Sequence, residues 1–153
     1  MRIILQSAAL FMILAASTGV YAQGQTATQS TPVAQAFEYY ERVRAALAAD
    51  SLTDALPHAK MLARTAAAAG GAAAKKPADA LASAANIEEA RKQFGELSTI
   101  LVPIFQAEAI PGTTAYMCPM KQKPWVQRGD KMANPYYGKA MLTCGTVLPA
   151  KVK

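Results

Sequence analysis

The sequence has few of the residue types on which most catalytic and metal sites depend. Its 153 residues include one histidine, His58, and two cysteines, Cys118 and Cys144. A single histidine excludes a three-histidine zinc site and the two-histidine ligand set of blue-copper proteins. No nucleophile elbow or phosphate-binding loop is present. The sequence therefore predicts a protein that is not an enzyme.

Long apolar segments are also scarce. The apolar run of residues 3–16 is interrupted by polar residues and falls short of the roughly 20 residues that a membrane-spanning helix requires. It follows Met1-Arg2 and precedes Val20-Tyr21-Ala22, which together form the pattern of a secretory signal peptide with its cleavage site. Residues 1–22 are therefore predicted to be a signal peptide. This implies an exported protein with no membrane span after cleavage.

Acidic residues are nearly absent from the last quarter of the chain. Residues 117–153 contain seven Lys and Arg against one Asp, whereas residues 23–116 contain eight against nine Asp and Glu. In a cytoplasmic protein this surplus would suggest nucleic acid as a partner, but the predicted export argues against it. The surplus is either a solvated basic surface or a set of cations that stabilises thiolate charge near the cysteines. The residues concerned are Lys121, Lys123, Arg128, Lys131 and Lys139.

The first two thirds of the mature chain carry the apolar spacing of amphipathic helices. Capping patterns at Thr31-Pro32, at residues 51–54 and at residues 86–89 predict three helix starts. We expect the first helix to end near Asp50, the second at Gly70-Gly71 and the third, kinked at Pro103, before Pro111-Gly112. A loop at residues 72–76 and a short fourth helix at 77–85 are also expected.

The pattern changes after Thr113, where short extended segments alternate with turn-forming residues. Residues 115–117, 125–127, 142–144 and 146–148 are candidate strands. The fold class predicted is mainly α, an antiparallel bundle of three to four helices with a small irregular or β cap at the C-terminal end. We expect one domain, residues 32–153, with a helical part at 32–112 and the cap at 113–148. Residues 23–31 are polar and small and are expected to form a flexible tail.

Sulfur is concentrated in this cap. It holds both cysteines and four of the five methionines that follow the signal peptide, namely Met117, Met120, Met132 and Met141. Cys118 and Met120 are two residues apart and would lie on one side of an extended segment. Met141 and Cys144 are three apart, which suits a turn that directs both inward. Thiolates and thioethers are soft donors that favour Cu(I) or Ag(I).

Two interpretations of this sulfur remain open. His58 and Met61 lie on one face of the second helix and could add a nitrogen and a sulfur to a metal site. Two cysteines in an oxidising compartment also commonly form a disulfide, and methionines often serve only as packing material. Closing a loop of about 27 residues would stabilise the fold by roughly 3–4 kcal/mol. The alternative to metal binding is thus a helical interaction module stapled by Cys118–Cys144.

The cap also carries a longer motif. Its segments are Tyr116-Met117-Cys118-Pro119-Met120, Trp125, Asn134-Pro135-Tyr136-Tyr137-Gly138 and Met141-Leu142-Thr143-Cys144-Gly145. This series resembles the DUF3347 family, a domain of unknown function. That domain occurs alone in exported bacterial proteins and fused to periplasmic adaptor subunits of heavy-metal efflux systems. The resemblance is looser in the helices and covers about residues 33–147.

The resemblance implies periplasmic handling of copper or silver. It makes Cys118, Met120, Met141 and Cys144 the candidate ligands of Cu(I) or Ag(I), with His58 as a fifth. The expected partners are the metal ion and a heavy-metal efflux adaptor or another envelope copper protein. Three aromatic residues, Trp125, Tyr136 and Tyr137, are expected to pack the cap onto the helices rather than to bind metal. Asn134-Pro135 and Gly138 are expected to form turns.

Overall fold

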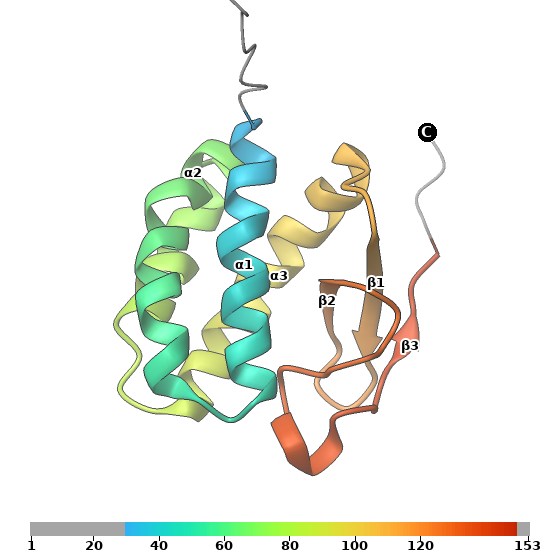
Figure 1. The fold of residues 1–153 in the computed structure, drawn as a ribbon. Helices are drawn as coiled ribbons and strands as arrows, with labels where there is room; N and C mark the ends of the chain where they lie inside the picture. The colour runs from blue at the N-terminus through green and yellow to red at the C-terminus, as the bar shows by residue number, and fades with distance from the viewer. Residues whose placement is uncertain (1–29, 150–153) are drawn as a thin grey trace, which may run out of the picture.

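The computed structural model describes residues 30–149, so the predicted signal peptide, most of the predicted tail and residues 150–153 lie outside the described part. Three helices precede a small sheet (Figure 1). The elements are α1 (Pro32–Ala48), α2 (Leu52–Ala82), α3 (Ile87–Glu108), β1 (Thr113–Cys118), β2 (Lys123–Arg128), the 3-10 helix η1 (Gly138–Met141) and β3 (Thr146–Val147). The mainly α class is confirmed, and the sheet is antiparallel.

All three predicted helix starts are confirmed by their caps. The side chain of Thr31 accepts a hydrogen bond from the third backbone amide that follows it, at 3.1 Å. Ser51 and Asn86 do the same at 3.2 and 2.9 Å. Each bond satisfies an amide that has no partner within the helix, which fixes where the helix begins.

The prediction of a loop at residues 72–76 is wrong. Gly71 leaves the helical conformation, with φ 69° and ψ −169°, but the chain resumes a helical path at once and α2 runs on to Ala82. Three residues of this second half, Ala74, Ala78 and Leu81, are fully buried at helical spacing. Alanine-rich sequence favours helix, and burial of this stripe stabilises it, so the glycine pair kinks the helix rather than ending it.

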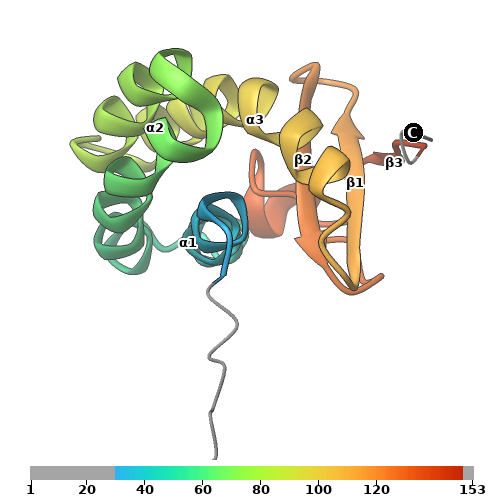
Figure 2. The same ribbon diagram turned by 90° about the horizontal axis from the view of Figure 1, so that it is seen from above.

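The sheet and α2 lie on opposite sides of α1 and α3 (Figures 1 and 2). The strand order is β2-β1-β3, with Tyr116 of β1 opposite Trp125 on one side and Val147 on the other. The predicted strands at 115–117 and 125–127 are confirmed. The one predicted at 142–144 is wrong, because backbone groups there form a turn. The carbonyl of Leu142 accepts from Asn134 N at 2.7 Å, and Cys144 N donates to the Met141 carbonyl at 3.1 Å.

A continuous aromatic core joins the helices to the sheet. Tyr40 of α1 stacks on Phe94 of α3 with ring centroids 4.7 Å apart, and Phe94 meets Tyr136 at 6.1 Å. Tyr136 then contacts Trp125 edge-on at 6.1 Å, and Trp125 stacks on Tyr116 at 5.1 Å. The prediction that Trp125 and Tyr136 pack the cap onto the helices is therefore confirmed.

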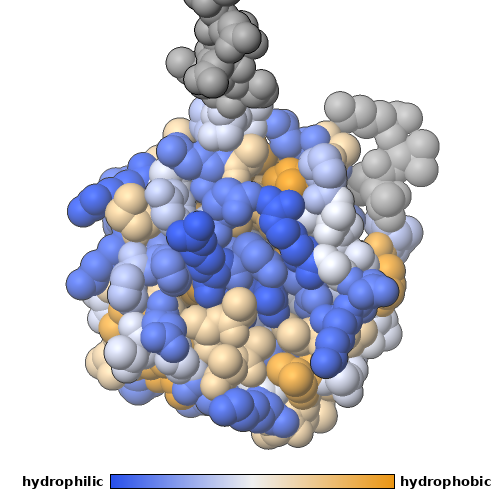
Figure 3. All heavy atoms as spheres, in the orientation of Figure 1, coloured by the Kyte–Doolittle hydropathy of each residue, from blue (hydrophilic) through white to orange (hydrophobic). Residues whose placement is uncertain are grey.

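The face in Figure 3 is largely hydrophilic, with only scattered hydrophobic side chains. Among residues 30–149, no helix combines the length and apolar character needed to cross a membrane. Scattered apolar residues of this kind are ordinary for a folded protein.

Candidate metal centre

Cys118 is the last residue of β1 and is fully buried. Successive side chains of a strand alternate between its two faces, so Cys118 shares a face with Tyr116, which stacks on Trp125. Its thiol is free of any disulfide. The aromatic core thus places this sulfur on the inner side of the cap.

Cys144 reaches the same region from another segment. It is half-buried, also free, and lies between η1 and β3. The register of β1 and β3 pairs Met117 with Thr146. Continuing this register by one residue places Cys118 opposite Gly145, the residue that follows Cys144.

Asn134 connects the two cysteine segments directly. Its side-chain nitrogen lies 3.4 Å from the Cys118 sulfur and 2.6 Å from the carbonyl oxygen of Cys144. Its side-chain oxygen accepts the backbone N–H of Tyr136 at 2.8 Å. Asn134 is fully buried, and the sequence predicted no more than a turn for it.

Two buried arginines hold the backbone on either side of Asn134. Arg44 of α1 donates to the Ala133 carbonyl at 2.9 Å, and Arg91 of α3 donates to the Pro135 carbonyl at 3.1 Å. These residues lie far apart in the sequence, so no local pattern could have indicated that they meet. The helices therefore fix the position of the Asn134 segment through charged side chains.

Carboxylates neutralise both arginines, as buried charges require. Glu41 pairs with Arg44 at 2.8 Å, whereas Asp50 and Glu88 pair with Arg91. Asp50 also accepts the backbone N–H of Lys139 at 3.1 Å. The Arg91 hydrogen bond first, and the Lys139 N–H second, hold the pKa of Asp50 below its usual value.

A second buried amide secures the loop that precedes Asn134. The side-chain oxygen of Gln127 accepts the indole N–H of Trp125 and the backbone N–H of Ala133, each at 3.0 Å. Its nitrogen donates to the Lys131 carbonyl at 2.7 Å. Gln127 thus shapes the same loop as Asn134 but makes no hydrogen bond to either cysteine.

Two methionines lie close to the segment of Cys144. Met141 is half-buried and closes the turn to Cys144 through its carbonyl, as the spacing predicted. Met132 is half-buried, and its sulfur lies 3.0 Å from where a Cβ on Gly145 would sit. We call Cys118, Met132, Met141 and Cys144 the sulfur cluster. Sequence reasoning did not select Met132, because only the fold brings it beside Gly145.

Met120 lies differently from the sequence expectation. β1 ends at Cys118, so the alternation of an extended segment does not continue to Met120. Met120 lies in the turn between β1 and β2 and is 58% exposed, whereas Cys118 is buried. The structure therefore places these two sulfur atoms in different environments.

The structure does not bring His58 to the cap. His58 is half-buried on α2, the helix on the far side of α1 and α3 from the sheet (Figure 2). The sulfur of Met61, its neighbour on the same face, contacts Arg64 of the same helix at 3.6 Å. These two donors are thus separated from the sulfur cluster by the helical layer.

Several cap cations have partners on the helices. Lys123 pairs with Glu96 of α3 at 3.1 Å, and Arg128 pairs with Glu38 of α1. These two ion pairs dock the hairpin of β1 and β2 onto the helices.

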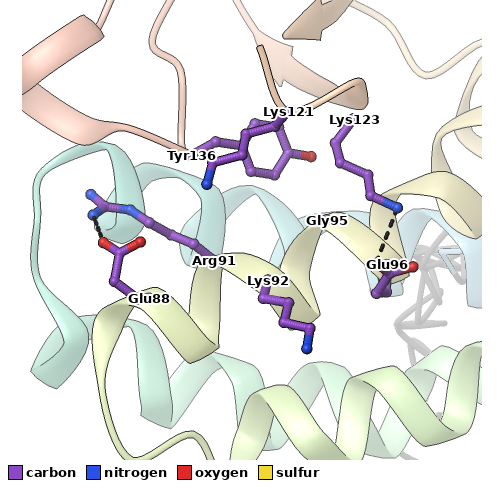
Figure 4. A pocket seen from close by; sticks show the side chains of 8 residues that line it. All are labelled: Glu88, Arg91, Lys92, Gly95, Glu96, Lys121, Lys123 and Tyr136. Atoms are coloured by element: carbon purple, nitrogen blue, oxygen red, sulfur yellow. Dashed lines mark hydrogen bonds and ion pairs between the residues drawn. The ribbon is translucent and has the colours of Figure 1, made fainter. Parts of the chain in front are cut away.

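A charged hollow of about 130 Å³ lies between α3 and the turn that joins β1 to β2 (Figure 4). Its rim includes the ion pairs Glu88–Arg91 and Glu96–Lys123. The residues that line it are Glu88, Arg91, Lys92, Gly95, Glu96, Lys121, Lys123 and Tyr136. None of them carries sulfur, so this hollow is not part of the sulfur cluster.

The chemistry available to the cluster is that of soft donors. Within residues 30–149, no three His, Cys, Asp or Glu side chains converge in a way that could hold a metal. Methionine sulfur is the further donor available to a metal bound at the two cysteines. Such a set suits Cu(I) or Ag(I) and is poor for Mg²⁺ or Ca²⁺.

Comparison of the chain with protein-family models, with curated proteins and with solved structures found no match. The likeness to the DUF3347 family thus stays a resemblance of residue pattern.

Proposed function

We propose that this chain is an exported, periplasmic protein that binds Cu(I) or Ag(I) through its sulfur cluster. It would sequester the ion or pass it to a heavy-metal efflux adaptor or another envelope copper protein. One observation carries the proposal: the Asn134 amide reaches both the Cys118 sulfur and the Cys144 backbone. Asn134 thereby links the sulfur of one free cysteine to the backbone of the segment that carries the other.

The proposed ligands follow from placement. Cys118 and Cys144 supply the thiolates, and Met141, in the same turn as Cys144, supplies a thioether. Met120 can join only if its exposed turn moves inward, and His58 is left out because α2 lies beyond the other helices. For the scaffold we propose an antiparallel bundle, which the short connections at residues 49–51 and 83–86 support.

The experiment is a competition titration with a Cu(I) chelator under anaerobic conditions. Substituting a residue that only supports a metal ligand typically lowers metal affinity by roughly 10–100-fold. The Cys118→Ser, Cys144→Ser double variant, which removes two ligands, should lose more Cu(I) affinity than this. Its helical circular dichroism should not change, because neither cysteine lies in a helix.

Methionine variants refine the test. Met141→Leu should weaken binding, whereas Met61→Leu, a matched control on α2, should leave the affinity unchanged. If the double cysteine variant keeps wild-type affinity, the thiolate site does not exist.

The same adjacency favours one other candidate, a disulfide-stapled interaction module without metal. Neighbouring cysteines in an oxidising compartment are the ordinary precursors of a disulfide. Counting free thiols in protein purified without air separates the two. Two reactive thiols and one bound Cu(I) support the metal site, whereas two cysteines that stay linked under mild reductant support the staple.

A further inference from the structure

We infer that Asn134 is the positioning residue of the sulfur cluster, holding the Cys118 sulfur and the Cys144 backbone in register for one metal ion. The inference rests on the proposed metal site and adds a residue that is not among its proposed ligands. A carboxamide nitrogen has two N–H donors. Here one faces the Cys144 carbonyl at 2.6 Å and the other faces the Cys118 sulfur at 3.4 Å.

The orientation of the Asn134 amide is determined by its neighbours. The side-chain oxygen accepts the Tyr136 N–H at 2.8 Å. If the amide were turned over, its nitrogen would face the Tyr136 N–H, a second donor, and its oxygen would face the Cys144 carbonyl, a second acceptor. A fully buried side chain cannot tolerate two such unpaired contacts. The nitrogen must therefore face both cysteine segments.

The backbone of Asn134 is held as firmly as its side chain. Arg44 and Arg91 bind the carbonyls of the residues before and after it. Its own N–H donates to the Leu142 carbonyl at 2.7 Å, which ties down the turn that carries Met141 and Cys144. Asn134 thus anchors one half of the cluster through its backbone and joins it to the other half through its amide.

This placement has a chemical consequence for metal binding. An N–H donated to a sulfur becomes charge-assisted, and so stronger, when that sulfur carries the negative charge of a metal-bound thiolate. Hydrogen bonds from groups around a ligand orient the ligand, and their loss typically lowers metal affinity about 10–100-fold. Asn134 would therefore favour the loaded state without touching the metal.

The test compares Asn134→Asp with Gln127→Glu. Both substitutions replace a buried amide of the same loop by a carboxylate, but only the first removes donors that face the cysteines. Cu(I) affinity is measured by chelator competition. In metal-free, reduced protein carrying Cys144→Ser, the rate at which Cys118 reacts with an aromatic disulfide reagent is measured as well. Thermal unfolding of each variant shows how far the whole fold is weakened.

We expect Asn134→Asp to bind Cu(I) about 10–100-fold more weakly and to expose Cys118 to the reagent at least about tenfold faster, because the turn is released from the buried thiol. Gln127→Glu should change either quantity by less than about threefold at a comparable melting temperature. If the two variants lose affinity and gain reactivity equally, Asn134 is only a structural residue and the inference is overturned.

The two proposals fail in distinguishable ways. Wild-type protein without Cu(I) affinity removes the metal site, whereas wild-type binding that survives Asn134→Asp removes only the role of Asn134. If Asn134→Asp loses its helical circular dichroism, Asn134→Ser replaces it in both measurements. A serine hydroxyl is too short to span both cysteine segments, so the same differences from Gln127→Glu are expected.

Discussion

Gly145 lies between Cys144 and β3, and replacing it by alanine should separate the two halves of the sulfur cluster. A Cβ at this position would lie 2.5 Å from Cη2 of Trp125 and 3.0 Å from the Met132 sulfur. The Trp125 ring cannot move aside, because it is fully buried and stacks on Tyr116. Its indole N–H is also bonded to Gln127. The backbone at Gly145 must therefore shift, and Cys144 shifts with it.

The size of the effect follows from the contact. Adding a methyl group to a tightly packed region typically destabilises a protein by about 1–3 kcal/mol. For a folded part of this size, 1 kcal/mol corresponds to a fall in Tm of about 4 °C. Gly145→Ala should therefore melt about 4–12 °C below the wild type. It should also bind Cu(I) more weakly than its loss of stability alone explains.

Gly112→Ala is the matched control, measured by thermal unfolding at 222 nm and by chelator competition. Gly112 has φ +69° and no atom within 4 Å of a built Cβ, so only backbone strain of about 1–2 kcal/mol is added. Its Tm should fall by about 4–8 °C with no change in Cu(I) affinity. A Gly145→Ala variant with the wild-type Tm and affinity would refute the close packing of Gly145 on Trp125.

Two further predictions concern pH. Arg91 lowers the pKa of Asp50 in the folded state. The ionised carboxylate therefore stabilises the fold at pH values above the pKa that Asp50 has in the unfolded chain. This contribution is lost as the pH falls through the lower pKa of the folded state. The urea midpoint of the wild type should therefore drop more steeply between about pH 5 and 2 than that of Asp50→Asn, and equal slopes would contradict this. Burial raises the pKa of Tyr40, so its contribution is complete below the unfolded pKa of about 10 and is lost as pH rises beyond it. Tyr40→Phe removes the partner of the Ser98 hydroxyl and should be about 1 kcal/mol less stable than the wild type at pH 7. Between about pH 9 and 11, however, its free energy of unfolding should fall by less than that of the wild type. An equal fall in both proteins would contradict this prediction.

Much of the helical part could be predicted because helix starts are local. Thr31, Ser51 and Asn86 each bond an amide only three residues away. The error at residues 72–76 has the opposite origin. Gly70-Gly71 has the composition of a helix end, but burial of Ala74 and Ala78 against other elements keeps the chain helical. The stabilisation that this burial provides cannot be read from any local sequence pattern.

The candidate site was predictable only in part. Spacing and residue chemistry selected Cys118, Cys144 and Met141, because sulfur donors can be recognised from their identity. Asn134 carried only a turn signal, and Arg44 gave no indication that it holds the loop before it. Their roles arise from contacts between segments that are far apart in the chain, which spacing cannot reveal.

The sequence by itself determined where the helices begin, which segments form β1 and β2, and that sulfur gathers near the C-terminal end. Each of these depends on residue identity or on neighbours a few positions away. The tertiary structure alone decided that the Cys118 sulfur and the Cys144 backbone both contact Asn134, and that Met120 lies exposed. It also decided that α2, the helix that carries His58, lies on the far side of α1 and α3 from the sheet. The physical reason is that the aromatic core and the buried arginines, which join α1 and α3 to the cap, determine which donors approach one another.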